Sequence, residues 1–248
     1  MIHMDNITKF NGVDYTNTFA TRIGVMHELV KEVLSTQISK GDCVIDIGGG
    51  PGMGARIIDS MGIVASVVNI EPSTTIHDVP RLLHVKYTPM QISFKDALEV
   101  RMPYPADCLL IVSAAHEIAL CNNSSASKNK EIYSNEINQF IRNNLKPEGI
   151  IVAGFPNYRK GASPTEIAKQ RRITESHLGH SHPAEELFTI EELSQIFGTR
   201  PSVYVKRPMN IEGGNPDDTI LIANVAVFKK MYISDRIDRI DRISLANP

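Results

Sequence analysis

A cluster of glycines near residue 50 constrains the fold of this chain more than any other feature. The run reads Val44-Ile45-Asp46-Ile47-Gly48-Gly49-Gly50-Pro51-Gly52-Met53-Gly54-Ala55. Glycine lacks a Cβ atom, so a backbone rich in glycine can turn tightly and approach a ligand closely. A helix that follows such a turn points its unpaired N–H groups toward the same ligand. The run predicts a strand, a tight turn and a helix around a nucleotide-like ligand.

Apolar strands and helical segments alternate on both sides of this run. Strands are expected at residues 43–47, 64–70, 82–87, 108–113 and 150–155, and helices at 18–37, 53–61 and 131–145. The segment Lys146–Gly149 is expected to form a turn before the last of these strands. Strands that alternate with helices are typical of an α/β fold with a doubly wound, mostly parallel sheet.

The second half of the chain follows a different pattern. Ser163-Pro164-Thr165-Glu166 and Thr189-Ile190-Glu191-Glu192 each have the spacing of a helix capping box. Two further strands, 203–206 and 219–229, predict an antiparallel edge on the parallel sheet. We expect a single domain over residues 1–248, in which 1–40 form an N-terminal helical lid, 159–200 a helical insertion and 233–248 a tail.

Composition narrows the class of partner. The 248 residues include 26 basic and 28 acidic side chains, a balance that indicates neither a nucleic acid nor another polyanion as partner. The three cysteines lack C-x-x-C spacing, which favours a reduced compartment. No apolar run of about 20 residues and no secretory leader is visible. We expect a cytoplasmic protein, monomeric or homodimeric, that does not bind membranes and acts on a small molecule.

Two interpretations of the glycine run compete. Gly50-x-Gly52-x-x-Ala55 satisfies the dinucleotide-binding fingerprint, and Glu71 lies at about the distance expected for a ribose contact. Asp46 argues against a dinucleotide, because a carboxylate makes no favourable interaction with a pyrophosphate. A cofactor with a cationic ammonium group would instead be attracted to this carboxylate. The long helix before the first strand and the strand pair near the end of the chain also argue against it.

These residues resemble the class I S-adenosylmethionine-dependent methyltransferases. The acid-x-Gly-x-Gly-x-Gly motif of that family is matched by Asp46, Gly48, Gly50 and Gly52, with Gly49 as an additional glycine. The acidic residue that ends the second strand is matched by Glu71. The resemblance covers roughly residues 18–229. It implies a seven-stranded sheet with an antiparallel strand and S-adenosyl-L-methionine as the cofactor.

The resemblance also implies where the cofactor lies. Its ammonium group is expected near Asp46 and its ribose at Glu71. The family often has an acidic residue followed by a small one after the third strand, and this chain departs from that pattern. We therefore expect Met90 against the adenine ring and Gln91 near its amino group, or Met90 as an ordinary core residue. Ser113, after the fourth strand, is a further candidate cofactor contact.

The acceptor end of the site is expected after the fourth and fifth strands, because strand ends line the ligand crevice of a doubly wound sheet. His116 is the candidate general base, or else it caps the next helix or contacts the cofactor. The candidate substrate contacts are Asn157 and Tyr158 after the fifth strand, Tyr15 in the lid and His180 in a histidine-rich loop.

That loop, His177-Leu178-Gly179-His180-Ser181-His182, also invites a metal interpretation. Its spacing fits neither a His-Glu-x-x-His helix nor a zinc finger, and Pro183 interrupts the segment. We expect no metal here and favour a polar loop with one histidine facing the substrate.

The function expected is O- or N-methylation of a small metabolite. The Asn/Asp-Pro-Pro-Tyr/Phe motif of enzymes that methylate nucleic-acid amino groups is absent, and Ser113-Ala114-Ala115-His116 stands in its place. Three alternatives stay open. They are non-methyl chemistry on the same cofactor (aminocarboxypropyl transfer or cyclisation), an NAD-dependent oxidoreductase, and a non-catalytic cofactor-binding subunit.

Overall fold

The computed structural model describes residues 24–122, 124–178, 181–209 and 219–230. The expectations for Tyr15, His180 and the 233–248 tail lie outside these residues, as does most of the proposed N-terminal lid. The strands are β1 (Cys43–Ile47), β2 (Ala65–Ile70), β3 (Val85–Met90), β4 (Ala106–Val112), β5 (Leu145–Tyr158), β6 (Val203–Pro208) and β7 (Leu221–Lys229). The helices are α3 (Gly24–Gln37), α4 (Met53–Ser60), α5 (Phe94–Ala97), α6 (Ala115–Leu120), α7 (Ala126–Asn144), α8 (Pro164–Leu178) and α9 (Ile190–Phe197), with a 3₁₀ turn at Thr74–His77.

The strands form one seven-stranded sheet in the order β3-β2-β1-β4-β5-β7-β6. The first five are parallel, and β7 lies antiparallel between β5 and β6. The predicted doubly wound, mostly parallel sheet with an antiparallel edge is confirmed. Helices α8 and α9 lie between β5 and β6 in the chain, where the helical insertion was expected.

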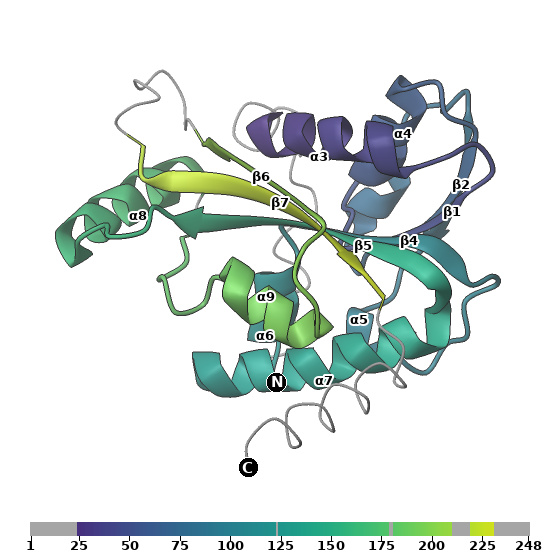
Figure 1. Cartoon of the computed structure of the whole chain (residues 1–248). Coiled ribbons are helices and arrows are strands. Elements are labelled where there is room, and N and C mark those ends of the chain that lie inside the picture. Colours follow the sequence, from purple (N-terminus) through teal and green to yellow (C-terminus); the bar gives the residue numbers. More distant parts are fainter. Residues whose placement is uncertain (1–23, 123, 179–180, 210–218, 231–248) are drawn as a thin grey trace, which may run out of the picture.

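Helices pack on both faces of the sheet (Figure 1). Apolar residues of α3 and α4 form one buried cluster with one face of β1, β4 and β7. Residues of α5, α6, α7 and α9 form the second cluster on the opposite face. Strands β1 and β4 are buried on both faces, which explains why their sequences are mostly apolar. No helix in the described ranges is long and apolar enough to cross a membrane.

Two boundaries differ from the sequence prediction. Strand β3 covers residues 85–90 rather than 82–87; it lies at the sheet edge with little buried surface, so its apolar pattern is weak. The predicted turn at Lys146–Gly149 is wrong, because β5 runs continuously through it. Leu145 pairs with Ala106 and Ile150 with Cys108, so a bulge absorbs the residues between.

The strand order positions the site. The chain leaves β1 toward β2 on one side and later returns to β4 on the other, so the carboxyl ends of β1 and β4 flank the point where the winding reverses. Gly48, directly after β1, has φ +70°, and Ser113, directly after β4, has φ +54°. Ser113 is the one non-glycine residue with positive φ in the described ranges, and such strain commonly occurs at functional sites.

Candidate active site

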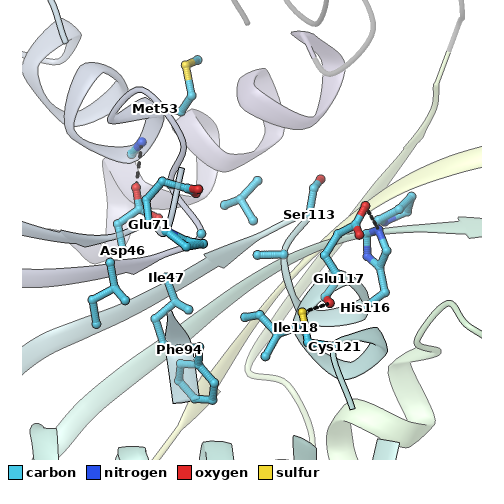
Figure 2. A pocket seen from close by; sticks show the side chains of 18 of the residues that line it. Asp46, Ile47, Met53, Glu71, Phe94, Ser113, His116, Glu117, Ile118 and Cys121 are labelled. Carbon is cyan, nitrogen blue, oxygen red and sulfur yellow. Dashed lines mark hydrogen bonds and ion pairs between the residues drawn. The ribbon is translucent and has the colours of Figure 1, made fainter. Parts of the chain in front are cut away.

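A cavity of about 410 Å³ lies at the carboxyl ends of β1, β2 and β4. Its volume is within the range of small-molecule binding sites. Figure 2 shows Asp46 and Glu71 on one side of the cavity and His116 and Glu117 on the other. The cavity therefore has two ends of different chemistry.

Asp46 lies at the glycine-loop end. Its side chain is buried, and Oδ2 accepts a hydrogen bond from the Gly54 N–H at 3.1 Å. Burial raises the pKa of Asp46 to about 7, although the bond from Gly54 acts in the opposite direction. Gly49 and Gly54 are needed for this packing. A Cβ on either would overlap the Asp46 carboxylate, and one on Gly49 would also lie 2.6 Å from Asn69 Oδ1.

Glu71, after β2, is tied to the same loop. Its Oε2 accepts a hydrogen bond from the Gly50 N–H at 3.1 Å, and its Oε1 accepts one from the Ser73 N–H at 2.9 Å. Asn69 strengthens the connection by donating to the Gly50 carbonyl at 2.9 Å. Each carboxylate oxygen can accept a second hydrogen bond, so Glu71 can still receive hydroxyl donors from a ligand.

The residues expected at the adenine do not line the cavity. Met90 packs against the buried cluster on the α7 face, and Gln91 is exposed and bonded to His77 at 3.0 Å. The cavity wall beyond β3 is formed by the next segment, including Phe94 and Asp96. The sequence does carry a signal for this segment, because Ser93-x-x-Asp96 is a helix-capping pattern and the Ser93 hydroxyl accepts the Asp96 N–H.

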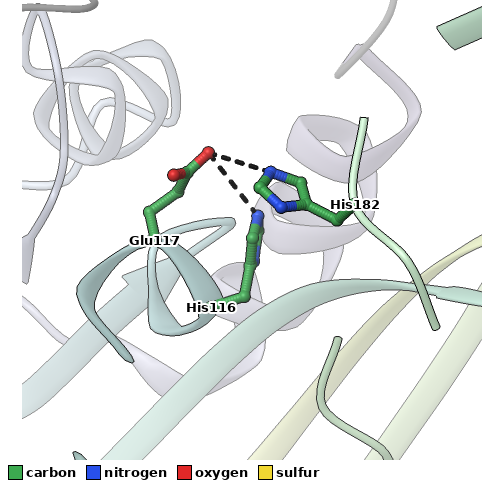
Figure 3. Close-up of side chains that lie close together, drawn as sticks. All are labelled: His116, Glu117 and His182. Atoms are coloured by element: carbon green, nitrogen blue, oxygen red, sulfur yellow. Dashed lines mark hydrogen bonds and ion pairs between the residues drawn. The ribbon is translucent and has the colours of Figure 1, made fainter. Parts of the chain in front are cut away.

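The other end of the cavity holds a cluster of ionisable side chains. His116 is buried in the first turn of α6, next to Glu117. His182 approaches from the connection between α8 and α9, with Nε2 at 3.1 Å from Glu117 Oε1 (Figure 3). His116 Nε2 lies 3.9 Å from the same oxygen. The imidazole rings of His116 and His182 lie edge to face, with their centroids 4.7 Å apart. Ser113 also lines the cavity.

Asn157 and Tyr158, at the end of β5, hold the connection that carries His182. Tyr158 lines the cavity and donates through its hydroxyl to the His182 carbonyl at 2.8 Å. Asn157 does not line the cavity; its Nδ2 donates to the Phe188 carbonyl at 2.9 Å. The sequence does not single out His182, because only the folded chain shows that its side chain faces α6.

No protein-family model and no curated protein sequence matches the chain. Solved structures do resemble it. The cyclopropane synthase MmaA2 from Mycobacterium tuberculosis is 11% identical, with 82% of this chain and 84% of that chain covered and a TM-score of 0.54. A protein solved in work on the conversion of a disulfide bond into a thioacetal group during echinomycin biosynthesis is 16% identical, with 88% of both chains covered and a TM-score of 0.52.

The plantazolicin methyltransferase BpumL, solved in complex with a monoazolic desmethylPZN analog and SAH, is also 16% identical, with 88% of both chains covered and a TM-score of 0.50. At such low identity the likeness concerns the fold. Strand order, the antiparallel β7 and the likeness to these structures agree: the chain has the fold of the class I S-adenosylmethionine-dependent methyltransferases.

Proposed function

We propose that this protein binds S-adenosyl-L-methionine in the cavity and transfers its methyl group to a small molecule. One observation carries the proposal. Two buried carboxylates, Asp46 and Glu71, line the same cavity on either side of the glycine loop. A ligand that carries both a cationic group and a ribose could bind to both carboxylates. The shared fold supports the same assignment.

The residues of this end fit such a cofactor. Glu71 would accept the ribose hydroxyls with its remaining lone pairs, and Asp46 would face the ammonium group. Phe94 and Ile70 supply apolar wall beyond Glu71, where an adenine ring would lie. Gly48 and Gly49 also line the cavity, while Gly50 and Gly52 shape the loop behind it.

When bound, the cofactor supplies an electrophilic methyl carbon. The protein then needs to orient an acceptor and keep water away from the reacting atoms. We propose that the acceptor lies between Ser113 and His116, opposite Glu71. An imidazole at His116 either accepts a proton from the acceptor or holds a metal ion that binds it.

The acceptor we propose is a small metabolite with an oxygen or nitrogen nucleophile. Apolar side chains such as Ile118 and Leu187 line the cavity next to the polar cluster at α6. None of the three cysteines is disulfide-bonded, and we propose a cytoplasmic setting, in which they would stay as thiols. We propose a monomer or homodimer that uses neither nucleic acid nor membrane.

The identity of the sulfur by-product tests the reaction type. Purified protein is incubated with S-adenosylmethionine and pools of fractionated metabolites, and the nucleosides are separated by mass spectrometry. The expected result is S-adenosylhomocysteine, formed in proportion to a product heavier than its precursor by one methylene unit. Methylthioadenosine instead would assign aminocarboxypropyl transfer or cyclisation and contradict methyl transfer.

A further inference from the structure

The cluster at the acceptor end has the composition of a metal site. His116, Glu117 and His182 offer one ligand atom each, and the three atoms lie within 4.8 Å of one another. All three side chains line the cavity and are partly or largely buried. Two come from consecutive residues of α6, and the third from the connection between α8 and α9 (Figure 3).

We propose that His116, Glu117 and His182 bind one divalent transition-metal ion. Two imidazoles and one carboxylate form a known ligand set for zinc and for non-haem iron, and both leave coordination positions open. Metal–nitrogen and metal–oxygen bonds are about 2.0–2.2 Å long. To reach these lengths, each ligand atom would move toward the ion by about 1 Å or less. Small rotations of side chains that already converge would achieve this.

Glu186 strengthens the assignment. Its Oε2 lies 3.1 Å from His182 Nδ1. In the tautomer in which Nδ1 donates to Glu186, the lone pair of Nε2 faces Glu117. Metal-binding histidines commonly have such an outer carboxylate, which fixes the tautomer and the ring orientation. A lone pair on Nε2 at 3.1 Å from a carboxylate oxygen is repelled unless a proton or a metal ion lies between them. A metal ion that also binds His116 would meet this requirement.

The chain holds these ligands in place from both sides. Tyr158 fixes the His182 carbonyl at 2.8 Å, and Asn157 fixes the Phe188 carbonyl at 2.9 Å. On the α6 side, the Ser113 N–H donates to the Gly154 carbonyl at 2.7 Å, which ties the strained turn before His116 to β5. Ligands positioned by hydrogen-bonded backbone lose little entropy on metal binding.

This proposal revises the expectation that the histidine-rich loop binds no metal. The spacing of the loop alone fits no common metal motif, because the remaining ligands come from α6. The open positions of the ion would face the cavity and bind the acceptor through an oxygen or nitrogen atom. That last step rests on the proposed methyltransferase function, whereas metal binding itself does not.

Metal analysis of the full chain, purified without a histidine tag, tests the proposal. Chelator-treated protein is titrated with Zn²⁺, and Co²⁺ is used in parallel for its visible ligand-field spectrum. About one equivalent of metal per chain is expected, with a Co²⁺ spectrum typical of four or five ligands. Glu117→Gln and His182→Ala should each abolish stoichiometric binding. Glu186→Gln should retain it with an affinity lowered by about 10–100-fold.

His77→Ala and Glu131→Gln are the matched controls, since both residues are exposed and neither lines the cavity. Circular dichroism and urea unfolding check that each variant is folded. Absence of stoichiometric metal in the wild type would overturn the proposal, as would equal binding by wild type and folded Glu117→Gln. S-adenosylmethionine binding is measured separately, so a failure of this site is distinguishable from a failure of the proposed function.

Discussion

At the scale of single residues, the two cofactor-facing carboxylates differ in their surroundings. Glu71 receives two backbone N–H groups, whereas Asp46 receives one and is almost completely buried. Burial disfavours the charged form of Asp46 and raises its pKa to about 7. A cationic ligand beside Asp46 would favour the charged form again, so ligand binding and deprotonation are coupled at this residue.

Asp46→Asn should change how stability depends on pH. The folded-state pKa of about 7 lies above the ordinary value of 3.8, so the folded protein binds more protons between these values. The contribution of Asp46 to stability is therefore largest below pH 4 and declines as the pH rises toward 7, by a few kcal/mol in order of magnitude. The substituted protein has a neutral amide there and should lack this decline. Urea unfolding at pH 5 and pH 8 measures it, and equal pH dependence in both proteins would count against the assignment.

Gly49→Ala should damage both stability and cofactor binding. The added Cβ would overlap the Asp46 carboxylate and approach Asn69 Oδ1, so the buried side chains must move. A loss of about 1–3 kcal/mol in the free energy of unfolding is expected from such overpacking. Gly24→Ala is the matched control, because a Cβ there meets nothing within 4 Å. Urea unfolding should separate the two variants; similar effects of both would refute the packing argument.

At the scale of secondary-structure elements, the end of β5 controls the second half of the site. Asn157 and Tyr158 reach across to the connection between α8 and α9, and Thr189 then starts α9 with a complete capping box. The position of His182 therefore depends on hydrogen bonds from a distant strand, which local sequence patterns do not reveal.

Tyr158→Phe should loosen this connection without affecting the glycine loop. The substitution removes the hydroxyl that donates to the His182 carbonyl, a bond worth about 1 kcal/mol. Amide hydrogen exchange in residues 181–188 should become severalfold faster, while residues 48–54 stay unchanged. Tyr104→Phe is the control, since Tyr104 is exposed. Unchanged exchange in residues 181–188 would show that Tyr158 does not hold the connection.

The elements also show what the sequence could predict. Strands β1, β2 and β4 were predicted within a few residues, because buried parallel strands are continuous apolar runs. The edge strand β3 lies three residues further along the chain than predicted, since a half-exposed strand carries little apolar signal. The bulged start of β5 looks like a turn in sequence because Pro147 and Gly149 are typical of turns.

At the scale of the whole molecule, one cavity is lined by two groups of residues, the glycine loop with Glu71 and the cluster of His116 and His182. The sequence predicts the first group better than the second. The glycine loop follows β1, and Glu71 follows the neighbouring parallel strand β2. The fold class therefore predicts that they lie close together, as the hydrogen bond between Gly50 and Glu71 shows. His116, expected just after the fourth strand, lies in the first turn of α6 and in the cavity wall. Its neighbour His182 was not predicted, because the α8–α9 insertion meets α6 only through tertiary packing.

The central claim is that this cavity binds S-adenosylmethionine through Glu71. Isothermal titration of the full chain with S-adenosylmethionine, and separately with NAD, tests it most directly. One site with micromolar affinity for S-adenosylmethionine and no binding of NAD are expected. Glu71→Gln should weaken binding by at least about tenfold, because it removes a charged acceptor of the ribose hydroxyls. Glu131→Gln, at an exposed ion pair with Lys128, should bind like the wild type. Binding of NAD without S-adenosylmethionine, or undiminished binding by Glu71→Gln, would contradict the account.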